Sequence, residues 1–195
     1  MVIKSPYSSC TSLNPVNPQI ADVYHSRGIA YSKKGNLYLA IQDFGQAIKI
    51  NPKYEQVYVN RGITYNKLGK SNQAIQDFNQ AIKINPQYGD AYNGRAFTYY
   101  QQGKLDLALA DSNKSLIIEP KNAAFYDTRG VIYEKQGKID LAIVDYNQAI
   151  KFNPKLADTF LNRGNTYYKK GNKQQAIKDL ETAKQLFQQQ GNIQV

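Results

Sequence analysis

A proline recurs every 34 residues along most of this chain of 195 residues. The prolines of this series are Pro18, Pro52, Pro86, Pro120 and Pro154. The spacing divides the chain into five units of equal length, 21–54, 55–88, 89–122, 123–156 and 157–190. Short units of this kind bury their apolar side chains against their neighbours, so we expect one elongated domain. Residues 1–20, rich in Ser, Pro and Asn, are predicted to form a flexible N-terminal tail, and 191–195 a C-terminal tail.

Each unit contains two stretches with the apolar spacing of an amphipathic helix. Counted from the start of a unit, positions 4, 8 and 11 hold an aromatic, a small and an aromatic residue, which lie within about 60° on one helix face. Position 15 is always Gly, where the end of a helix favours a left-handed residue. The second stretch has Ala at position 20 and, in four units, ends before a proline that cannot continue a helix. The predicted helices cover 22–34, 38–50, 56–68, 72–84, 90–102, 106–118, 124–136, 140–152, 158–170 and 174–190.

This residue pattern over 34 positions resembles the tetratricopeptide repeat family. The resemblance implies an all-α fold, a right-handed α-solenoid or superhelix of five helix-turn-helix pairs, in which the first (A) helices line a concave groove and the second (B) helices cover them. It also implies a non-catalytic scaffold that binds a protein or peptide in that groove. Asn60 and Asn162 match the asparagine position that binds peptide backbone in O-GlcNAc transferases. The dicarboxylate clamp of chaperone-binding members is not found, which disfavours a chaperone tail as partner.

Two charged positions are the same in every unit. Position 7 is arginine and position 23 is aspartate. An arginine at the edge of a buried face needs a partner, and its planar guanidinium can form two parallel hydrogen bonds with a carboxylate. We therefore predict that each arginine pairs with an aspartate, within a unit or between neighbours; the alternative is a row of arginines that binds phosphates. The arginines are Arg27, Arg61, Arg95, Arg129 and Arg163, and the aspartates Asp43, Asp77, Asp111, Asp145 and Asp179.

Positions that vary between units lie mostly on the face of the A helices opposite the packing surface, where they are free for function. Amides can bond a peptide backbone, rings can cover its side chains, and lysines attract carboxylates. The expected partner is therefore a protein or peptide that is acidic or contains aromatic residues; the alternative is a face that is only solvated. The predicted groove residues are Lys33, Asn60, Asn66, Lys67, Asn93, Phe97, Tyr100, Asp127, Glu134, Lys135, Asn162, Asn165, Tyr168 and Lys169.

Some positions depart from the pattern or allow two interpretations. Position 9 is Ile29, Ile63, Phe97, Val131 and Asn165. Its apolar residues either line the groove floor or pack between adjacent A helices, and packing is the preferred interpretation. In the third unit, Ser112 and Ser115 replace a large residue and a residue that is otherwise Ala, which predicts a cavity or polar spot and local softness. The fifth unit lacks the proline, so its B helix is predicted to continue to a cap at Gly191.

Self-assembly is the alternative to binding another protein. No separate solvating helix follows the fifth unit, so its last helix could pack against another chain in a homo-oligomer, by two-fold pairing or end-to-end stacking. The candidates for this contact are Leu180, Leu186 and Phe187.

The formal net charge of +10 would suit an acidic protein, a nucleic acid or an anionic membrane. Most of the excess comes from lysines near predicted helix ends, where a cation favours the helix dipole by about 0.3–1 kcal/mol. No basic run alternates with accessible aromatic residues, which disfavours nucleic acid. No stretch approaches the roughly 20 apolar residues of a membrane span. We therefore expect no membrane partner and a cytoplasmic location, unless an N-terminal leader was removed or mis-assigned.

Catalysis and cofactor binding find little support. His25 is the only histidine, which excludes a His-rich metal site. Cys10 is the only cysteine, so it has no intramolecular disulfide partner, and its place in the tail predicts an inert thiol. The glycines are isolated, without the spacing of a phosphate-binding loop. We expect no enzyme activity, no cofactor and no metal.

Overall fold

The computed structural model describes residues 18–191, which form ten helices and no strand. The A helices are α1 (Pro18–Lys33), α3 (Glu55–Lys67), α5 (Gly89–Gln101), α7 (Ala123–Lys135) and α9 (Ala157–Lys169). The B helices are α2 (Leu37–Ile50), α4 (Ser71–Ile84), α6 (Leu105–Ile118), α8 (Ile139–Phe152) and α10 (Lys173–Gln189). These bounds confirm the predicted helices, most of them to within one residue at each end. Cys10 and most of the predicted N-terminal tail lie outside the described residues.

The first helix starts earlier than predicted, because α1 begins at Pro18 rather than at residue 22. A proline fits the first turn of a helix, since the N–H group that it lacks has no partner inside the helix there. The predicted tail, 1–20, therefore overlaps α1 over its last residues.

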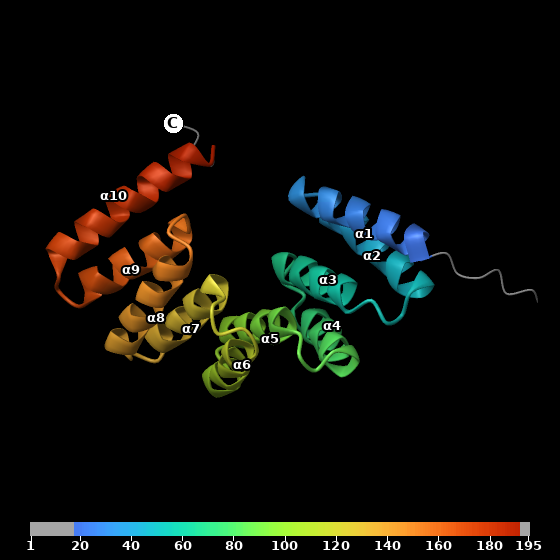
Figure 1. The fold of residues 1–195 in the computed structure, drawn as a ribbon, viewed down its shortest axis with the longest axis horizontal. Coiled ribbons are helices and arrows are strands. Elements are labelled where there is room, and N and C mark those ends of the chain that lie inside the picture. Colours follow the sequence, from blue (N-terminus) through green and yellow to red (C-terminus); the bar gives the residue numbers. More distant parts are fainter. Residues whose placement is uncertain (1–17, 192–195) are drawn as a thin grey trace, which may run out of the picture.

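The helix pairs follow one another along an arc (Figure 1). Each A helix packs against the B helix of its own unit and beside the A helix of the next unit, whereas no two B helices within residues 18–191 lie side by side. The A helices thus form a continuous row, with α3, α5 and α7 on the inner side of the arc and α4 and α6 on its outer side (Figure 1). The arrangement confirms the all-α solenoid.

The turns between A and B helices contain the glycines of position 15. Their φ angles are positive in every unit, for example 71° at Gly69 and 86° at Gly171, as the left-handed helix stop requires. At the end of the last helix, Gly191 has a φ of 70°, and α10 has 17 residues where α8 has 14. The predicted extension of the last helix to Gly191 is confirmed.

Close contact within a unit depends on the small residue at position 8. A Cβ atom at Gly62 would lie 2.9 Å from the ring of Phe78, and one at Gly130 would lie 2.6 Å from the ring of Tyr146. In the third unit the residue facing position 8 is the small Ser112, and position 8 is the larger Ala96. The side chains at the two positions therefore compensate in size, as close packing requires.

Every unit is held together by the predicted pair of arginine and aspartate. Arg61 donates from Nε to Asp77 Oδ2 at 2.8 Å and from Nη2 to Asp77 Oδ1 at 2.7 Å, and the other units repeat both bonds. In the third to fifth units, Nη1 also donates to an asparagine of the preceding B helix, as Arg95 does to Asn79. The prediction is confirmed, with the aspartate always in the same unit. The arginines join helices and do not form a free row for phosphates.

Candidate functional site

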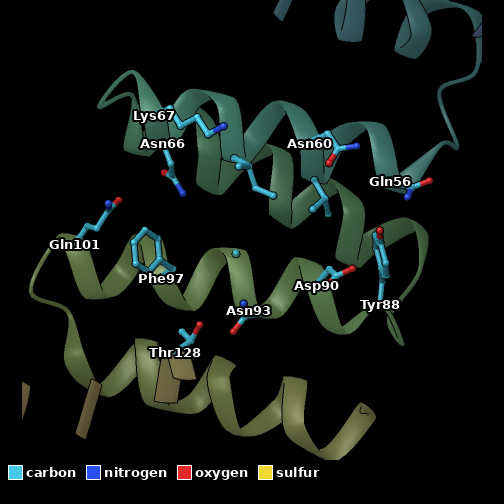
Figure 2. A pocket seen from close by; sticks show the side chains of 13 residues that line it. Gln56, Asn60, Asn66, Lys67, Tyr88, Asp90, Asn93, Phe97, Gln101 and Thr128 are labelled. Carbon is cyan, nitrogen blue, oxygen red and sulfur yellow. The ribbon is translucent and has the colours of Figure 1, made fainter. Parts of the chain in front are cut away.

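A pocket of about 470 Å³ lies between α3 and α5 on the face formed by the A helices (Figure 2). Its floor contains Ile63 and Phe97, whose side chains are 41% and 40% exposed. These two residues line the groove, which corrects the interpretation of position 9 as a packing position. Packing does apply to Ile29, which lies against the core around Phe44. Ile29 is half-buried and also lines a smaller pocket between α1 and α3.

Gly94 helps to keep this pocket open. It occupies position 6 of its unit, where the other units have Ser26, Asn60, Thr128 and Asn162. Gly94 lines the pocket without a side chain, and a Cβ atom there would lie 2.5 Å from the ring of Phe78. The same glycine thus allows Phe78 to approach α5 and leaves room between α3 and α5.

Hydrogen bonds inside the protein fix the orientation of Asn66 in the pocket wall. Its Nδ2 donates to Thr98 Oγ1 at 2.7 Å, and the Thr98 hydroxyl donates to the carbonyl of Gly94 at 2.8 Å. The Thr98 oxygen can therefore only accept from Asn66. Asn66 Oδ1 is left buried without a partner, as is Asn93 Oδ1. An unpaired buried acceptor costs about 1–3 kcal/mol, and a ligand donor would remove this cost only if the amide group turned toward the pocket.

Asn60 is oriented by a network that reaches back to α1. His25 Nδ1 lies 3.1 Å from Tyr54 Oη, and His25 Nε2 lies 2.7 Å from Asn60 Nδ2. The amide nitrogen of Asn60 can only donate, so His25 Nε2 accepts, and Nδ1 of the neutral ring carries the proton that faces Tyr54 Oη. Burial lowers the pKa of His25, which favours this neutral ring. One of the two amide N–H groups of Asn60 is therefore engaged, which fixes the side chain and leaves its second N–H and its carbonyl oxygen for a ligand.

A second pocket of about 350 Å³ follows along the A helices and is more polar. Its lining residues are Tyr100, Val131, Glu134, Lys135, Asn162 and Lys169. Glu134 accepts hydrogen bonds from Lys169, Thr166 and Tyr146. Burial by itself would raise the pKa of Glu134, but the bonds from Lys169 and Thr166 outweigh it and lower the pKa. Lys135 has no hydrogen-bond or ion-pair partner among the described residues, so it is the cation of this pocket that is free for a ligand.

The structure brings most of the predicted groove residues into pockets on one face. The pocket between α3 and α5 contains Asn60, Asn66, Lys67, Asn93 and Phe97. The second pocket contains Tyr100, Glu134, Lys135, Asn162 and Lys169. Lys33 and Lys67 share a third pocket, of about 170 Å³, between α1 and α3.

Other predicted groove residues lie apart from these pockets. Asp127 accepts a hydrogen bond from Asn162 at 3.3 Å, so these two side chains satisfy each other between α7 and α9. Asn165 and Tyr168 are exposed on α9 and line none of the three pockets. The amide group of Asn162, like that of Asn60, is used inside the protein, which weakens the likeness to a backbone-binding asparagine.

Several residues of the main pocket are absent from the predicted groove set, among them Asp90 and Tyr88. Asp90 lies at position 2 of its unit, on the variable face, so the helical periodicity contained a signal for it. Tyr88 lies before the start of α5, where no helical pattern could place its ring. Figure 2 shows both side chains at one end of the pocket, with Lys67 and Gln101 at the other.

The candidates for self-association lie on α10. A Cβ atom at Gly164 would lie 3.0 Å from Leu180 Cγ, so Leu180 faces α9 inside its own unit. This position does not fit the expectation that Leu180 contacts another chain. Leu186 and Phe187 are half-buried. The large apolar residue of α10 that is well exposed is Ile177, at 58%.

Metal sites and membrane spans were sought in residues 18–191. No group of three or more His, Cys, Asp or Glu side chains in this range could hold a metal ion. None of the helices in the same range combines the length and the apolar character needed to cross a bilayer.

Sequence comparisons match repeat families over most of the chain. Families described as tetratricopeptide repeat match residues 21–54 and 157–190, and residues 44–76. A family described as TPR repeat matches residues 64–103 and 130–171. No curated protein sequence matches the chain significantly.

Solved structures with the same fold are similar over most of the chain. A thermophilic TPR protein of Thermus thermophilus, TTC0263, is 21% identical with a TM-score of 0.77, over 84% of this chain and 89% of that one. PilF of Pseudomonas aeruginosa is 15% identical with a TM-score of 0.75, over 86% and 76%. YrrB, described as a TPR protein with an unusual peptide-binding site, is 20% identical with a TM-score of 0.58, over 87% and 88%. At these identities the likeness shows the fold alone. Together with the family matches, it means that the chain belongs to the tetratricopeptide repeat family, whose fold generally serves as a non-catalytic scaffold for interactions between proteins.

Proposed function

We propose that this chain is a non-catalytic scaffold that holds an extended segment of a partner protein against its A helices, centred on the pocket between α3 and α5. The observation that carries the proposal is the combination of exposed Ile63 and Phe97 on the floor with the amide side chains of Asn60, Asn66 and Asn93 along the wall. An apolar floor with a few polar groups in one concave site is the usual make-up of a ligand-binding pocket.

A polypeptide has the chemistry that this pocket needs. Its side chains can cover the apolar floor, and every residue except proline offers a main-chain N–H donor. A ligand without donors would leave the amide oxygens unpaired. An extended segment is therefore a better match to the pocket than a purely apolar small molecule.

Lysines mark one edge of the proposed binding face. Lys33, Lys67, Lys135 and Lys169 are at the C-terminal ends of their A helices. Lys169 is paired with Glu134, whereas Lys33 and Lys135 have no partner within residues 18–191. Acidic groups of a partner would therefore lie along this edge.

Selection from a library of random peptides displayed on phage tests the proposal. We expect the chain to enrich peptides whose affinity falls about tenfold or more in Phe97→Ala, because this variant removes the ring on the floor. Phe97 is 40% exposed, so its truncation should leave the melting temperature nearly unchanged. The matched control is Ile117→Ala, whose side chain is 74% exposed on the B helix α6. Failure to enrich any peptide, or equal binding by Phe97→Ala, would contradict the proposal.

Self-association through α10 is the alternative function. It is supported by the position of α10, which within residues 18–191 contacts only α9, and by the half-buried Leu186 and Phe187. Light scattering over a concentration series distinguishes the two functions. Growth of the molar mass with concentration, abolished by Leu186→Gln, would support self-association, and a constant monomer mass would exclude it.

A further inference from the structure

One end of the pocket between α3 and α5 is acidic, although the chain has a net charge of +10. Burial, followed by the charges of Asp90, Glu55 and Glu119, raises the pKa of Tyr88 at this end to about 12. None of these three carboxylates forms an ion pair within residues 18–191. Asp90, which lines the pocket, has no hydrogen-bond partner in that range either. The acidic end is therefore a group of charges without a cation.

Helix dipoles account for only part of this group. Asp90 and Glu55 lie in the first turns of α5 and α3, where a negative charge is favourable. Glu119 directly follows the last residue of α6, where a negative charge is unfavourable. Desolvation in the pocket and the charge of Glu119 raise the pKa of Asp90, as expected for a carboxylate without a compensating partner.

The pocket wall adds amide oxygens that have no partner among the described residues. One of the two amide N–H groups of Asn60 and of Asn66 is used, by His25 and Thr98 respectively, and the carbonyl oxygen of each amide has no partner among the described residues. The carbonyl oxygen of Asn93 is unpaired as well. A ligand with hydrogen-bond donors would suit these oxygens, and at the acidic end positive charge would suit Asp90 as well.

Charged groups of opposite sign lie at the two ends of the pocket. Lys67 lies at the C-terminal end of α3, opposite the end with Asp90 (Figure 2). The lining residues run along α3 from Gln56 to Lys67, which corresponds to about 16 Å at 1.5 Å per residue. A fully extended chain covers this length with about five residues.

We propose that the pocket between α3 and α5 selects a peptide segment with a lysine or arginine side chain, whose cationic head binds Asp90. This inference rests on the proposed function and names the chemistry of its ligand. The aliphatic stem of the basic side chain and a neighbouring apolar residue cover Ile63 and Phe97, and an acidic group about five residues away faces Lys67. A cation at Asp90 also relieves the repulsion between Asp90 and Glu119. The net charge of the chain predicts an acidic partner, whereas this pocket is proposed to bind a basic side chain.

The peptides enriched on the wild-type chain provide the test. We expect them to share a lysine or arginine, and their affinity to fall about tenfold in Asp90→Asn. The matched control is Asp106→Asn, which removes an exposed carboxylate from the first turn of α6 outside the pocket. Asp90→Lys should weaken the same peptides further. Added salt should weaken binding to the wild type more than to Asp90→Asn.

The outcomes separate this inference from the proposed function. Peptides that need Phe97 but contain no basic residue, or that bind Asp90→Asn as tightly as the wild type, would overturn the inference and leave the groove function standing. Enrichment of acidic peptides whose affinity depends on Lys67 and not on Asp90 would also overturn the inference and leave the groove function standing. Failure to enrich any peptide, or binding that ignores Phe97, would overturn both.

Discussion

His25 links three segments of the first two units through one buried ring, of which 6% is exposed. Phe44 of α2 packs against the ring, and Tyr54 and Asn60 bond its two nitrogens. Asp22 and Tyr54 are the titratable groups that face it, from α1 and from the loop before α3. Protonation would turn Nε2 from an acceptor into a donor opposite the Asn60 amide group, and so disrupt the network.

The first prediction is a loss of stability in mild acid that depends on His25. Burial lowers the pKa of His25 below its ordinary 6.5, against a smaller raising effect of Asp22. Above pH 6.5 the ring is neutral in the folded and the unfolded chain, so its contribution is complete. As the pH falls below 6.5, the unfolded chain binds a proton first, and the free energy of unfolding decreases until the folded pKa is passed.

Urea unfolding of the wild type and His25→Gln, from about pH 8 to about pH 5, measures this effect. The glutamine does not titrate, so the variant should lose less stability over this range than the wild type does. Carboxylates elsewhere affect both proteins equally and cancel in the comparison. Parallel stability curves would show that His25 has the same pKa in the folded and unfolded states.

Residue roles in the groove were only partly predictable from the sequence. Helical periodicity placed Asn60 and Asn66 on the variable face, and the structure finds both in the main pocket. Which atom of each amide is free depends on His25 and Thr98, which lie 35 and 32 residues away in the neighbouring units. A pattern within one helix has no information about these partners.

At the scale of the helices, the arginine of position 7 joins two units. In the third to fifth units its Nη1 donates to an asparagine of the preceding B helix, for example from Arg129 to Asn113 at 2.9 Å. The corresponding residue of α2 is Gly45, so Arg61 has no such partner. The contact between the first two units therefore lacks one hydrogen bond that later units have.

The second prediction is that Gly45→Asn restores this bond. A Cβ atom at Gly45 would lie 3.9 Å from Arg61 Nη1, which leaves room for a side chain. Helix propensity alone would make Asn stabilise α2 by about 0.3 kcal/mol and Ala by about 1 kcal/mol. A hydrogen bond to the guanidinium adds about 1 kcal/mol or more for Asn alone. We therefore expect Gly45→Asn to be at least as stable as Gly45→Ala in urea unfolding.

Arg61→Lys provides the control, because a lysine cannot keep both the bidentate pair with Asp77 and the bond to the introduced asparagine. In the Arg61→Lys background, helix propensity alone should set the relative stability of the two Gly45 variants, so Gly45→Ala should be more stable than Gly45→Asn. An asparagine variant that is less stable than the alanine variant in the presence of Arg61 would show that the bond does not form.

Helix boundaries were the most predictable feature of the fold. Gly at position 15 and the proline at position 32 mark both ends of most B helices, and the structure follows them. The start of α1 was missed because Pro18 was interpreted, like Pro52, as the end of a repeat. A proline can follow the end of one helix or occupy the first turn of the next. Which of the two applies depends on the residues that precede and follow the proline in the structure.

Across the whole molecule, the five units repeat in sequence but differ in their cores. Phe44, Phe78 and Tyr146 bury rings between the helices of their units. The third unit has Ser112 in that place, fully buried, with no hydrogen-bond partner for its Oγ among the described residues. Ser115 satisfies its own hydroxyl by donating to the carbonyl of Ser112 at 2.8 Å. Less apolar burial and one unpaired hydroxyl both weaken this unit.

The period of 34 residues predicted the solenoid because each unit must bury its apolar face against the next. The ligand was less predictable, since it depends on how side chains of different units combine. Ile63, Phe97 and Asp90 come from two units, and the net charge of the chain does not describe the charge around them.

The third prediction is that the array opens first at its third unit. Stability in a solenoid is a sum of unit and interface terms, so a weak unit opens with a lower free energy than its neighbours. We expect the amide hydrogens of α6 to exchange faster than those of α4 and α8, because the opening free energy of α6 should be about 1–3 kcal/mol lower. Native-state hydrogen exchange, read by mass spectrometry on peptides from each B helix, measures this difference.

A double variant provides the decisive comparison. Ala96→Gly with Ser112→Phe gives the third unit the pair of residues found at Gly62 and Phe78, and should slow exchange in α6 toward the rate in α4. Ser112→Phe alone should destabilise the chain, because the Ala96 methyl group would meet the ring at the short distance that a Cβ atom at Gly62 would have from Phe78, 2.9 Å. Equal protection of α4, α6 and α8 in the wild type would mean that the units open together, and the missing ring would then have no local effect.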